Sequence, residues 1–459
     1  MRTQSMKTEN HNASQTNGVL AKISLFPILL VNFIGTLGYS IILPFLIILV
    51  IRFGGDELMY GIMGATYSFF QLIGAPILGN WSDRFGRKKI LLLSQAGTFL
   101  AWILFIVALL IPETEIFNMN SASGNILLTM PLLLLFLARA LDGITGGNVS
   151  VANAYLADVT SEDDRKQNFG KMSAAANLGF IVGPALAGVL GATAYGELLP
   201  VTAAMLISLA AIFVIAFIMP ESKPCVLSKA VDQKRINKVF GQEQKDCYKL
   251  KGAEKFSFKK ILGLTHIPFM LFLYFLIFLA FNFFYVAFPI HAVEGLKWSV
   301  LEIGIFFSLI GLILVLVEGP ILSKISVRYS DGVLNIVGSI LLAFSFFLFT
   351  SESELIIFVG IILFSTGNGI MWPSFLSQLS KVADQKYQGA VQGFASSAGS
   401  LASIIGLIAG GFIYGILGVK TFLIPGFLFV LIFVLLILFF VIEKPGEQRN
   451  LNIESYEKT

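Results

Sequence analysis

The sequence predicts an all-α membrane protein with twelve transmembrane helices in two pseudo-symmetric six-helix halves, and three observations support this fold class. The 459 residues are 56% hydrophobic and only 13% charged, whereas soluble domains carry about 25% charged residues. The apolar residues gather in runs of roughly the 20 residues that a helix needs to cross a bilayer. A single long polar segment separates the first six runs from the last six.

The expected helices follow the apolar runs in order. They lie at residues 23–51, 58–78, 90–111, 129–158, 168–194, 198–219, 267–290, 301–323, 332–350, 354–380, 388–416 and 420–442. Residues 223–260 carry eleven Lys or Arg and contain no apolar run of membrane length, which predicts a polar loop. The expected parts of the chain are therefore a cytoplasmic tail (1–22), a first bundle (23–222), a cytoplasmic central loop (223–265), a second bundle (266–442) and a second cytoplasmic tail (443–459).

The two expected bundles resemble each other in sequence. Residues 76–78 and 320–322 both read Pro-Ile-Leu, and Arg84 then falls on Arg328 at the same offset of 244 residues. The glycines of the fifth run match those of the eleventh at an offset of 223 residues. The loop at 112–128 is long where its counterpart is very short, so an insertion there accounts for most of the difference. The pattern indicates an internal repeat of six helices.

The distribution of positive charge predicts the orientation of the chain. Of the 32 Lys and Arg, only Arg52, Lys297 and Lys420 fall in the loops on one side, Arg139 lies inside a run, and the others fall on the opposite side. Loops rich in Lys and Arg stay in the cytoplasm, so both termini are expected there. The polar start of the chain shows no cleavable signal peptide. Because no outward loop carries a glycosylation sequon, a bacterial inner membrane is the expected location.

The loop between the second and third runs carries the most informative motif. Residues 79–89 read Gly-Asn-Trp-Ser-Asp-Arg-Phe-Gly-Arg-Lys-Lys. Any short cytoplasmic loop tends to be basic, which explains the charge but not the order of the residues. The order resembles the helix 2–3 signature of the major facilitator superfamily of secondary transporters. The resemblance implies the major facilitator fold, a hydrogen bond from the start of the helix at 388–416 to Asp83, and a gating role for Gly79, Asp83, Arg84, Gly86, Arg87 and Lys88.

The run at 129–158 contains a pair of opposite charges. Asp142 follows Arg139 by three residues, so the two side chains share one helical face. An Arg inside a membrane is costly and needs a partner. One interpretation is a local ion pair that allows the helix to insert. The other is that Arg139 faces the cavity and tunes Asp142 as a group that binds and releases protons.

The run at 168–194 combines small residues with a proline, in the order Gly179, Gly183, Pro184 and Gly188. Small residues four apart allow close helix packing, and a proline introduces a bend. Ordinary packing would explain the glycines alone, whereas the Gly-Pro pair resembles the antiporter motif of drug-exporting facilitators. Together with Ala-Tyr-Leu-Ala-Asp at 154–158 and Pro-Glu-Ser at 220–222, it makes the first half similar to the tetracycline-efflux group of 12-helix drug:proton antiporters.

This resemblance raises the question of which group carries the proton. The tetracycline-efflux group commonly has an acidic residue in helix 1 at the position of Asn32, and an amide cannot cycle a proton. Asp142 and Glu318 are the clear carboxylates well inside the expected helices, and an intramembrane acid is a functional candidate by default. The candidates for proton coupling are therefore Arg139, Asp142 and Glu318. For Glu318, the alternative is a neutral acid that is hydrogen-bonded to a neighbour.

Polar and aromatic residues near the middles of the first, fourth, seventh and tenth runs are candidates for lining a central cavity. They are Asn32, Tyr39, Asn148, Asn282, Tyr285, Asn368 and Trp372. For each of them the alternative is an ordinary packing or hydrogen-bonding role. The sequence contains no nucleotide-binding loop, zinc-ligand spacing or nucleophile motif, so no metal, no cofactor and no enzymatic activity are expected.

The resemblance implies secondary active transport by alternating access, and we expect proton-coupled efflux of a small amphipathic, drug-like organic compound. The expected partners are this substrate, protons and the lipid bilayer, without nucleic acid, and the protein is expected to be a monomer. Two alternatives remain open. One is a metabolite or nutrient importer of the same fold, and the other is a membrane receptor or scaffold that does not transport.

Overall fold

The computed structural model describes residues 24–121, 124–146, 148–160, 164–222, 263, 266–382 and 388–456. Within these ranges, only the backbone is described for residues 118–121, 124–126, 148–149, 165–167, 388–390 and 440–456. The expected first tail (1–22) and almost all of the expected central loop (223–265) lie outside the described residues.

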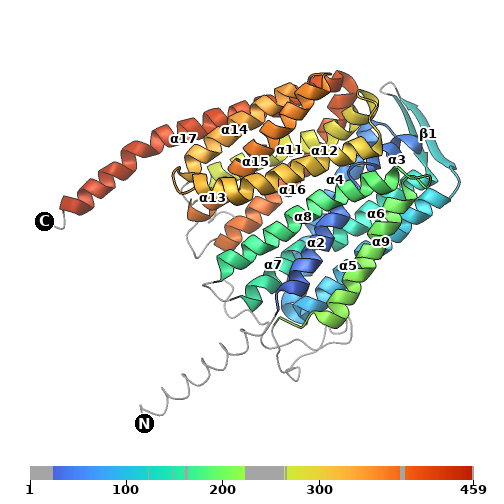
Figure 1. Cartoon of the computed structure of the whole chain (residues 1–459), viewed down its shortest axis with the longest axis horizontal. Helices are drawn as coiled ribbons and strands as arrows, with labels where there is room; N and C mark the ends of the chain where they lie inside the picture. The colour runs from blue at the N-terminus through green and yellow to red at the C-terminus, as the bar shows by residue number, and fades with distance from the viewer. Residues whose placement is uncertain are drawn as a thin grey trace, which may run out of the picture.

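The first part of the described chain is a helical bundle with one hairpin. It contains α2 (Phe26–Ser40), α3 (Leu46–Arg52), α4 (Glu57–Phe85), α5 (Arg87–Leu110), β1 (Glu115–Ser121), β2 (Gly124–Thr129), α6 (Met130–Thr145), α7 (Asn148–Val159), α8 (Arg165–Gly191), α9 (Leu198–Phe213) and the π-helical η1 (Val214–Ile218). Within it, α2 packs on α8, α6 packs on both α4 and α5, and α5 packs on α9. Figure 1 shows these blue to green helices together on one side of the molecule.

The second part is a bundle of helices alone. It contains α11 (Ile267–Glu294), α12 (Val300–Leu316), the π-helical η3 (Val317–Ile321), α13 (Leu322–Ile325), α14 (Asp331–Leu348), α15 (Glu354–Val382), α16 (Gln388–Leu417), the 3₁₀ turn η4 (Gly418–Phe422) and α17 (Leu423–Tyr456). Here α14 packs on α15 and α17, and α11 packs on α16. These yellow to red helices lie beside the first part in Figure 1.

Ten helical stretches of the described chain are long and apolar enough to cross a membrane. One of them, Val391–Phe439, has 49 residues and covers most of α16 together with the following turn and the first half of α17. The helix α2 is apolar but shorter than these stretches. The protein is therefore an integral, multi-pass, predominantly helical membrane protein.

The structure divides the run at 23–51 into two helices, where a single helix was expected. The chain turns after Ser40 and resumes helical structure at Leu46, and Pro44 lies in this turn. Proline has no N–H to donate to a helical hydrogen bond. The N–H groups of Leu43 and Phe45 instead donate to carbonyls three residues back at 3.2 Å. The result is a short helix α3 that is free to lie at an angle to α2.

Three other expected helices are also irregular, and one of them, at 198–219, ends in the π-helical η1. The run at 129–158 separates into α6 and α7, with Gly146 at the end of α6. The run at 301–323 contains the π-helical segment η3, which includes Glu318 and Pro320. A proline inside a helix removes one backbone hydrogen bond, and π-helical turns inside α-helices are frequent at functional sites.

The segment at 112–128, expected as a loop, forms an antiparallel hairpin of β1 and β2. The Thr129 side chain at its end donates a hydrogen bond to the carbonyl O of Phe53 at 2.9 Å. The hairpin is thereby tied to the end of α3. At the other end of the chain, α17 continues to Tyr456 and so extends into the expected second tail.

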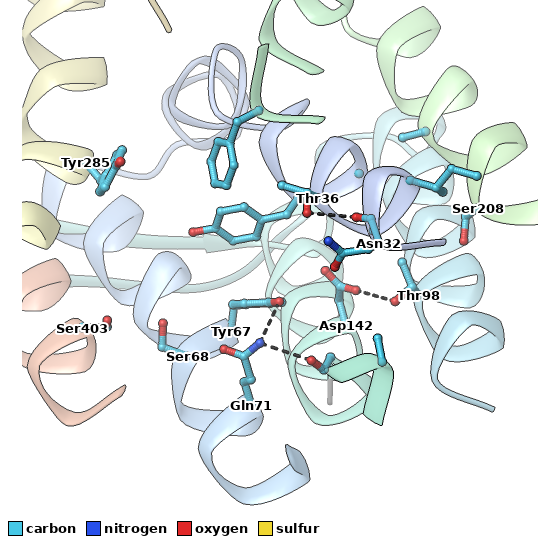
Figure 2. Close-up of a pocket in the computed structure, with 18 of the residues that line it drawn as sticks. Asn32, Thr36, Tyr67, Ser68, Gln71, Thr98, Asp142, Ser208, Tyr285 and Ser403 are labelled. Atoms are coloured by element: carbon cyan, nitrogen blue, oxygen red, sulfur yellow. Dashed lines mark hydrogen bonds between the residues drawn. The ribbon is translucent and has the colours of Figure 1, made fainter. Parts of the chain in front are cut away.

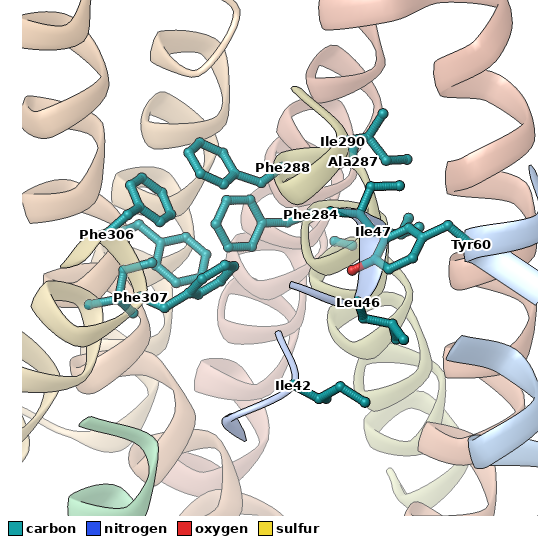
Figure 3. Packing of buried hydrophobic residues seen from close by; sticks show 14 of the residues in the cluster. Ile42, Leu46, Ile47, Tyr60, Phe284, Ala287, Phe288, Ile290, Phe306 and Phe307 are labelled. Carbon is teal, nitrogen blue, oxygen red and sulfur yellow. The ribbon is translucent and has the colours of Figure 1, made fainter. Parts of the chain in front are cut away.

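Aromatic packing holds the second part together and reaches the first. The rings of Phe288 and Phe306 stack with centroids 3.7 Å apart, and Phe284 lies next to them. One cluster of buried side chains contains these rings together with Ile47 of α3 and Tyr60 of α4. Figure 3 shows Ile47 and Tyr60 beside Ala287 and Ile290 of α11. The core is therefore continuous between the two parts at this level.

The two parts meet along two seams, α4 with α16 and α8 with α12. At the end of the molecule that carries α3, glycines allow these helices to approach backbone to backbone. A Cβ added to Gly61 would clash with the carbonyl O of Leu407, and a Cβ added to Gly304 would lie 2.5 Å from the carbonyl O of Pro184. We call this end, marked by Gly61 and Gly304, the closed end.

The same four helices leave room at the opposite end. A Cβ added to Gly79 of α4, Gly170 of α8 or Gly393 of α16 would have no atom within 4 Å apart from its own local backbone. We call this end, marked by these three glycines, the open end. At these glycines α4, α8 and α16 are therefore less tightly packed than at the closed end.

Candidate functional site

A cavity of about 570 Å³ lies among the helices of both parts. The first part contributes residues from α2, α4, α5, α6, α7, α8 and α9, and the second part from α11, α15 and α16. Six of the seven residues predicted to line a cavity lie in its wall, namely Asn32, Tyr39, Asn282, Tyr285, Asn368 and Trp372. The side chain of the seventh, Asn148, lies outside the described residues.

Asp142 supplies the one carboxyl among the described residues that line the cavity. Its Oδ1 accepts a hydrogen bond from Thr98 of α5 at 2.9 Å, and its Oδ2 lies 3.6 Å from the Arg139 guanidinium. Figure 2 shows Asp142 beside Asn32 and Thr98. The sequence predicted the pairing of Asp142 with Arg139, but it gave no indication of Thr98, which comes from another helix.

Arg139 is not among the described residues that line the cavity, whereas one of its two interpretations placed it facing the cavity. Its side chain is buried, and the guanidinium carbon lies 4.4 Å from the centroid of the Tyr67 ring on α4. The Nε of Arg139 has no hydrogen-bond partner among the described residues. The cation is therefore held between a carboxylate and an aromatic face, a cation–π geometry that is stronger when desolvated.

Gln71 fixes the position of the Tyr67 ring. Its Nε2 donates to the Tyr67 hydroxyl at 3.1 Å and to the carbonyl O of Gly146 at 3.3 Å. Both contacts are drawn in Figure 2. Because Tyr67 and Gln71 belong to α4 and Gly146 follows α6, these bonds tie the two helices together beside the Asp142 carboxyl.

Asn32 links two helices while it also borders the cavity. Its Nδ2 donates to the backbone carbonyl O of Met172 on α8 at 2.9 Å, and its backbone carbonyl O accepts a hydrogen bond from the Thr36 hydroxyl at 3.0 Å. The amide therefore satisfies a backbone carbonyl within the bundle, which a carboxylate could not do because it has no N–H. This explains structurally why an amide suits this position.

Aromatic rings form much of the remaining wall. In the first part Tyr39 lies 5.6 Å from Tyr67 and 6.0 Å from Phe180, measured between ring centroids. In the second part Phe278 and Trp372 lie 5.4 Å apart in an edge-to-face arrangement. Such a wall suits aromatic and apolar portions of a ligand, whereas the polar groups around Asp142 suit its polar portion.

Several cavity residues were missed by the sequence analysis, chiefly on the second, third and sixth runs. They include Tyr67, Ser68, Gln71, Gln95, Thr98 and Ser208. A usable signal existed, because each is a polar residue inside an otherwise apolar run. These six residues lie outside the first, fourth, seventh and tenth runs, from which the cavity residues were predicted.

Glu318 does not lie with the other charged candidates. It is absent from the cavity wall and sits on the seam between α8 and α12, where its Oε2 accepts a hydrogen bond from Asn177 at 2.6 Å. The structure therefore brings Arg139 and Asp142 together and leaves Glu318 at a separate place with a neutral partner.

The gating-loop residues form a cluster around Arg87. Its guanidinium pairs with Asp83 at 2.7 Å and with Asp158 at 3.1 Å, and it donates to the Ser82 hydroxyl at 2.6 Å. Gly86 joins α4 to α5 with a φ of 102°, a conformation that favours glycine. The side chains at the very start of α16 are not described, so the expected contact of Asp83 with that helix stays a prediction.

Three further loop residues lie around this cluster. Gly79 and Arg84 belong to the last turns of α4, and the backbone N–H of Lys88 at the start of α5 donates to Glu221 at 3.2 Å. A carboxylate at a helix N-terminus is favourable because it interacts with the exposed N–H groups and the helix dipole. Glu221, which the sequence analysis noted only as part of the Pro-Glu-Ser segment, therefore anchors the first turn of α5.

The helix 5 motif packs α8 against two different helices. A Cβ on Gly179 would lie 2.7 Å from the carbonyl O of Phe33, and one on Gly183 would clash with Ser40, so both glycines seat α8 on α2. A Cβ on Gly188 would lie 3.2 Å from the Cα of Leu301 on α12, the helix that also approaches Pro184. The motif thus serves the interior of the first part and the seam between the parts.

The fold and the cavity define a membrane transporter whose central cavity lies between two helical parts. The family model of the Major Facilitator Superfamily matches residues 28–407 and 336–458, and the chain belongs to this family.

Curated relatives of this chain include proteins named for drug resistance. It is 27% identical over 391 residues to the tetracycline resistance protein, class B, of Escherichia coli, which covers 84% of this chain and 87% of that protein. It is 28% identical over 402 residues to multidrug resistance protein 1 of Bacillus subtilis, which covers 85% and 89%. Among solved structures, a D-xylose–proton symporter superposes with a TM-score of 0.68 at 16% identity, covering 90% of this chain and 97% of that one.

Proposed function

We propose that this protein is a proton-coupled exporter of a small amphipathic organic compound and works by alternating access. One observation carries the proposal most strongly. The cavity between the two parts combines aromatic walls with one half-buried carboxyl among the described lining residues, that of Asp142, which is held by a cation and a hydroxyl. The relatives named for tetracycline and multidrug resistance support export rather than uptake.

The proposal includes twelve transmembrane helices in two pseudo-symmetric halves. The 49-residue stretch Val391–Phe439 contains parts of two helices, α16 and α17, and α2 is a further apolar helix. Counting these separately with the other nine stretches supports twelve spans. The sequence repeat, at an offset of 244 residues before the long loop at 112–128 and of 223 residues after it, supports the relation between the halves.

We further propose that both termini lie in the cytoplasm of a bacterial inner membrane, because the Lys and Arg residues gather on that side. The loop that carries Arg87 and Lys88 would then be cytoplasmic. Since this loop lies at the open end, the structure would represent the inward-facing conformation. The closed end, with Gly61 and Gly304, would face outward.

Asp142 is the better candidate for the proton-coupling group. It lies in the wall where a substrate would bind, whereas Glu318 lies on a seam with the neutral partner Asn177. A cationic or hydrogen-bond-donating group of the substrate and a proton would compete for the same carboxylate. Such competition is the simplest way to couple the export of one to the entry of the other.

The test uses purified protein in vesicles of known sidedness with an imposed pH difference, and tetracycline as the first probe. Wild-type protein should move the probe against its gradient in exchange for protons, and an uncoupler should abolish this transport. Asp142→Asn should abolish pH-driven accumulation, whereas Glu318→Gln, the matched control, should retain it. An Asp142→Asn variant that still concentrates the probe using only a pH difference would refute the assignment.

The choice of probe needs a parallel experiment in cells. A screen of compound accumulation in cells that lack their own exporters, with and without an uncoupler, should reveal amphipathic compounds whose accumulation falls when the protein is present. If compounds are instead taken up faster, the direction of transport in the proposal is wrong. No change for any compound would favour a membrane protein that does not transport.

A further inference from the structure

The cation of Arg139 has two partners that compete for it. Its guanidinium lies 3.6 Å from the Asp142 carboxylate, which is longer than the roughly 2.7–2.9 Å of a strong charge-assisted hydrogen bond. The guanidinium carbon also lies 4.4 Å from the centre of the Tyr67 ring. The side chain is buried, and its Nε has no hydrogen-bond partner among the described residues, so these two contacts are the ones that the structure gives the cation.

The Tyr67 ring is built into a fixed position. Its hydroxyl accepts a hydrogen bond from Gln71, and a Cβ added to Gly146 would lie 3.1 Å from that hydroxyl. The backbone of Tyr67 is also in close contact with Gly143 of α6, where a Cβ would clash with its carbonyl O. The ring therefore cannot withdraw from Arg139 without moving α4 relative to α6.

Tyr67 is also part of the cavity wall. Its ring lies 5.6 Å from that of Tyr39, which belongs to the same wall. A ligand that stacks on these rings touches the group that holds Arg139. The cation is thus linked to the cavity through the ring, although its own side chain does not line the cavity.

We propose that Tyr67 is a positioning residue that holds Arg139 partly away from Asp142, and so sets how readily Asp142 takes up a proton. If the ring is lost, the guanidinium can settle fully on the carboxylate and stabilise its charged form. If the ring is engaged by a ligand, the balance between the two partners of Arg139 changes. The inference rests on the proposed function, in which Asp142 is the proton-coupling group, and adds the residue that sets how readily Asp142 is protonated.

The surroundings of the pair contain few other groups that titrate. Among the described residues, the titratable groups that interact electrostatically with Arg139 or Asp142 include three tyrosines of α2 and α4, namely Tyr39, Tyr60 and Tyr67. The helix α5 also packs on α6, and from it Asp142 accepts a hydrogen bond from the neutral hydroxyl of Thr98. A change in the protonation behaviour of Asp142 in a Tyr67 variant is therefore traceable to the ring and to Arg139.

The test reads the protonation of Asp142 directly and needs no substrate. Infrared difference spectra of the purified protein are recorded as a function of pH, and the carboxyl band of Asp142 is identified by its loss in Asp142→Asn. Tyr67→Leu should move the midpoint of this band by about one pH unit toward acid, because a buried cation–π contact of the usual strength corresponds to a shift of about that size. Tyr67→Phe keeps the ring face and should leave the midpoint close to that of the wild type.

A graded series guards against a variant that fails to fold. Fluorinated phenylalanines at position 67 weaken the negative ring face stepwise with little change in size, so each added fluorine should move the midpoint further toward acid. The matched control is Tyr285→Leu, which removes an aromatic ring from the same cavity and should leave the midpoint unmoved. An unchanged midpoint across the fluorinated series would overturn the proposal.

The test also separates this inference from the proposed function. If wild-type vesicles show no proton-driven transport, the proposed function fails whatever the spectra show. If they transport, and the Tyr67 variants keep both the wild-type midpoint and the wild-type pH profile of transport, then only the positioning role is wrong. If Tyr67→Leu shifts the pH profile of transport toward acid and Tyr67→Phe restores it, both are supported.

Discussion

At the scale of single residues, the stability of the first part depends strongly on the ion pair of Arg139 and Asp142. A buried pair of opposite charges adds little stability, because both ions lose their hydration, but an isolated buried charge is very costly. Among the described residues the Nε of Arg139 has no hydrogen-bond partner, and its side chain interacts with Asp142 and the Tyr67 ring. The stability of the first part should therefore respond to the balance of charge in this pair more than to either residue alone.

Asp142→Asn should lower the free energy of unfolding by about 3–5 kcal/mol, the usual result of breaking a buried ion pair from one side. The double variant Arg139→Gln with Asp142→Asn should recover much of this loss, because no buried charge is left without a partner. Thermal unfolding in detergent measures both effects. A single Asp142→Asn variant that is as stable as the wild type would contradict this account and would indicate that water reaches Arg139.

Contacts between site residues could be predicted from the sequence only where the two partners lie close together in the chain. The spacing of Arg139 and Asp142 on one helical face is enough to predict their contact. The contacts with Thr98 and Tyr67 join different helices, and no periodicity within one helix specifies which neighbour it meets. The partner of Glu318 could not be predicted for the same reason, since Asn177 lies 141 residues away in the chain.

At the scale of helices, the apolar runs predicted where the helices are, but not how they break. Pro44 interrupts the first run, whereas Pro76 lies inside an uninterrupted α4 and Pro320 inside a π-helical turn. A proline removes one backbone hydrogen bond, but it does not by itself specify whether the chain turns, continues as an α-helix or widens into a π-helical turn. The hairpin at 115–129 was not predicted, because residues 112–128 were expected only as a long loop between two apolar runs.

The glycines of the seams predict how the helices can move. Gly61→Val should disfavour the closed end, because α4 cannot approach Leu407 and Gly411 with a side chain in between. Overpacking of this kind costs about 1–3 kcal/mol, enough to change the ratio of two conformations at least about fivefold. Distances between spin labels on α4 and α16 at the closed end measure the ratio, after replacement of Cys225 and Cys247.

The matched control for this experiment lies on α16. Gly393→Ala adds a side chain where no atom other than its own local backbone lies within 4 Å. It should therefore not reduce the population of the conformation in which the closed end is packed and the open end is open. Equal distance distributions for Gly61→Val and Gly393→Ala would show that the glycine crossing does not limit closure.

At the scale of the whole molecule, the charged cluster around Arg87 is expected to influence whether the two parts are open or closed at the open end. Asp83 pairs with Arg87 at the open end, and Arg87 has a second acidic partner in Asp158. In the proposed outward-facing conformation, the family resemblance implies that Asp83 accepts hydrogen bonds from the start of α16. The carboxylate would then stabilise that conformation through the N-terminal end of a helix.

Asp83→Asn should therefore shift the protein toward the conformation with the open end open. The size should be on the order of 1 kcal/mol, as for a charge at a helix N-terminus, and Arg87 keeps Asp158 in the variant. Spin labels on α4 and α16 at the open end report the change. The idea fails if the distance distribution of Asp83→Asn matches that of the wild type under conditions where both conformations are populated.

The presence of a single carboxyl in the described cavity wall sets a thermodynamic ceiling on the proposed export. One titratable acid moves at most one proton per cycle, so a pH difference of one unit can sustain at most about a tenfold concentration ratio of a substrate. If the substrate is a monovalent cation, the exchange moves no net charge and the membrane potential contributes nothing. If it is neutral, each cycle carries one charge inward, and the potential adds about 2.3 kcal/mol per 100 mV. A measured concentration ratio above these limits would require a second coupled proton, and Glu318 would be the first place to look for it.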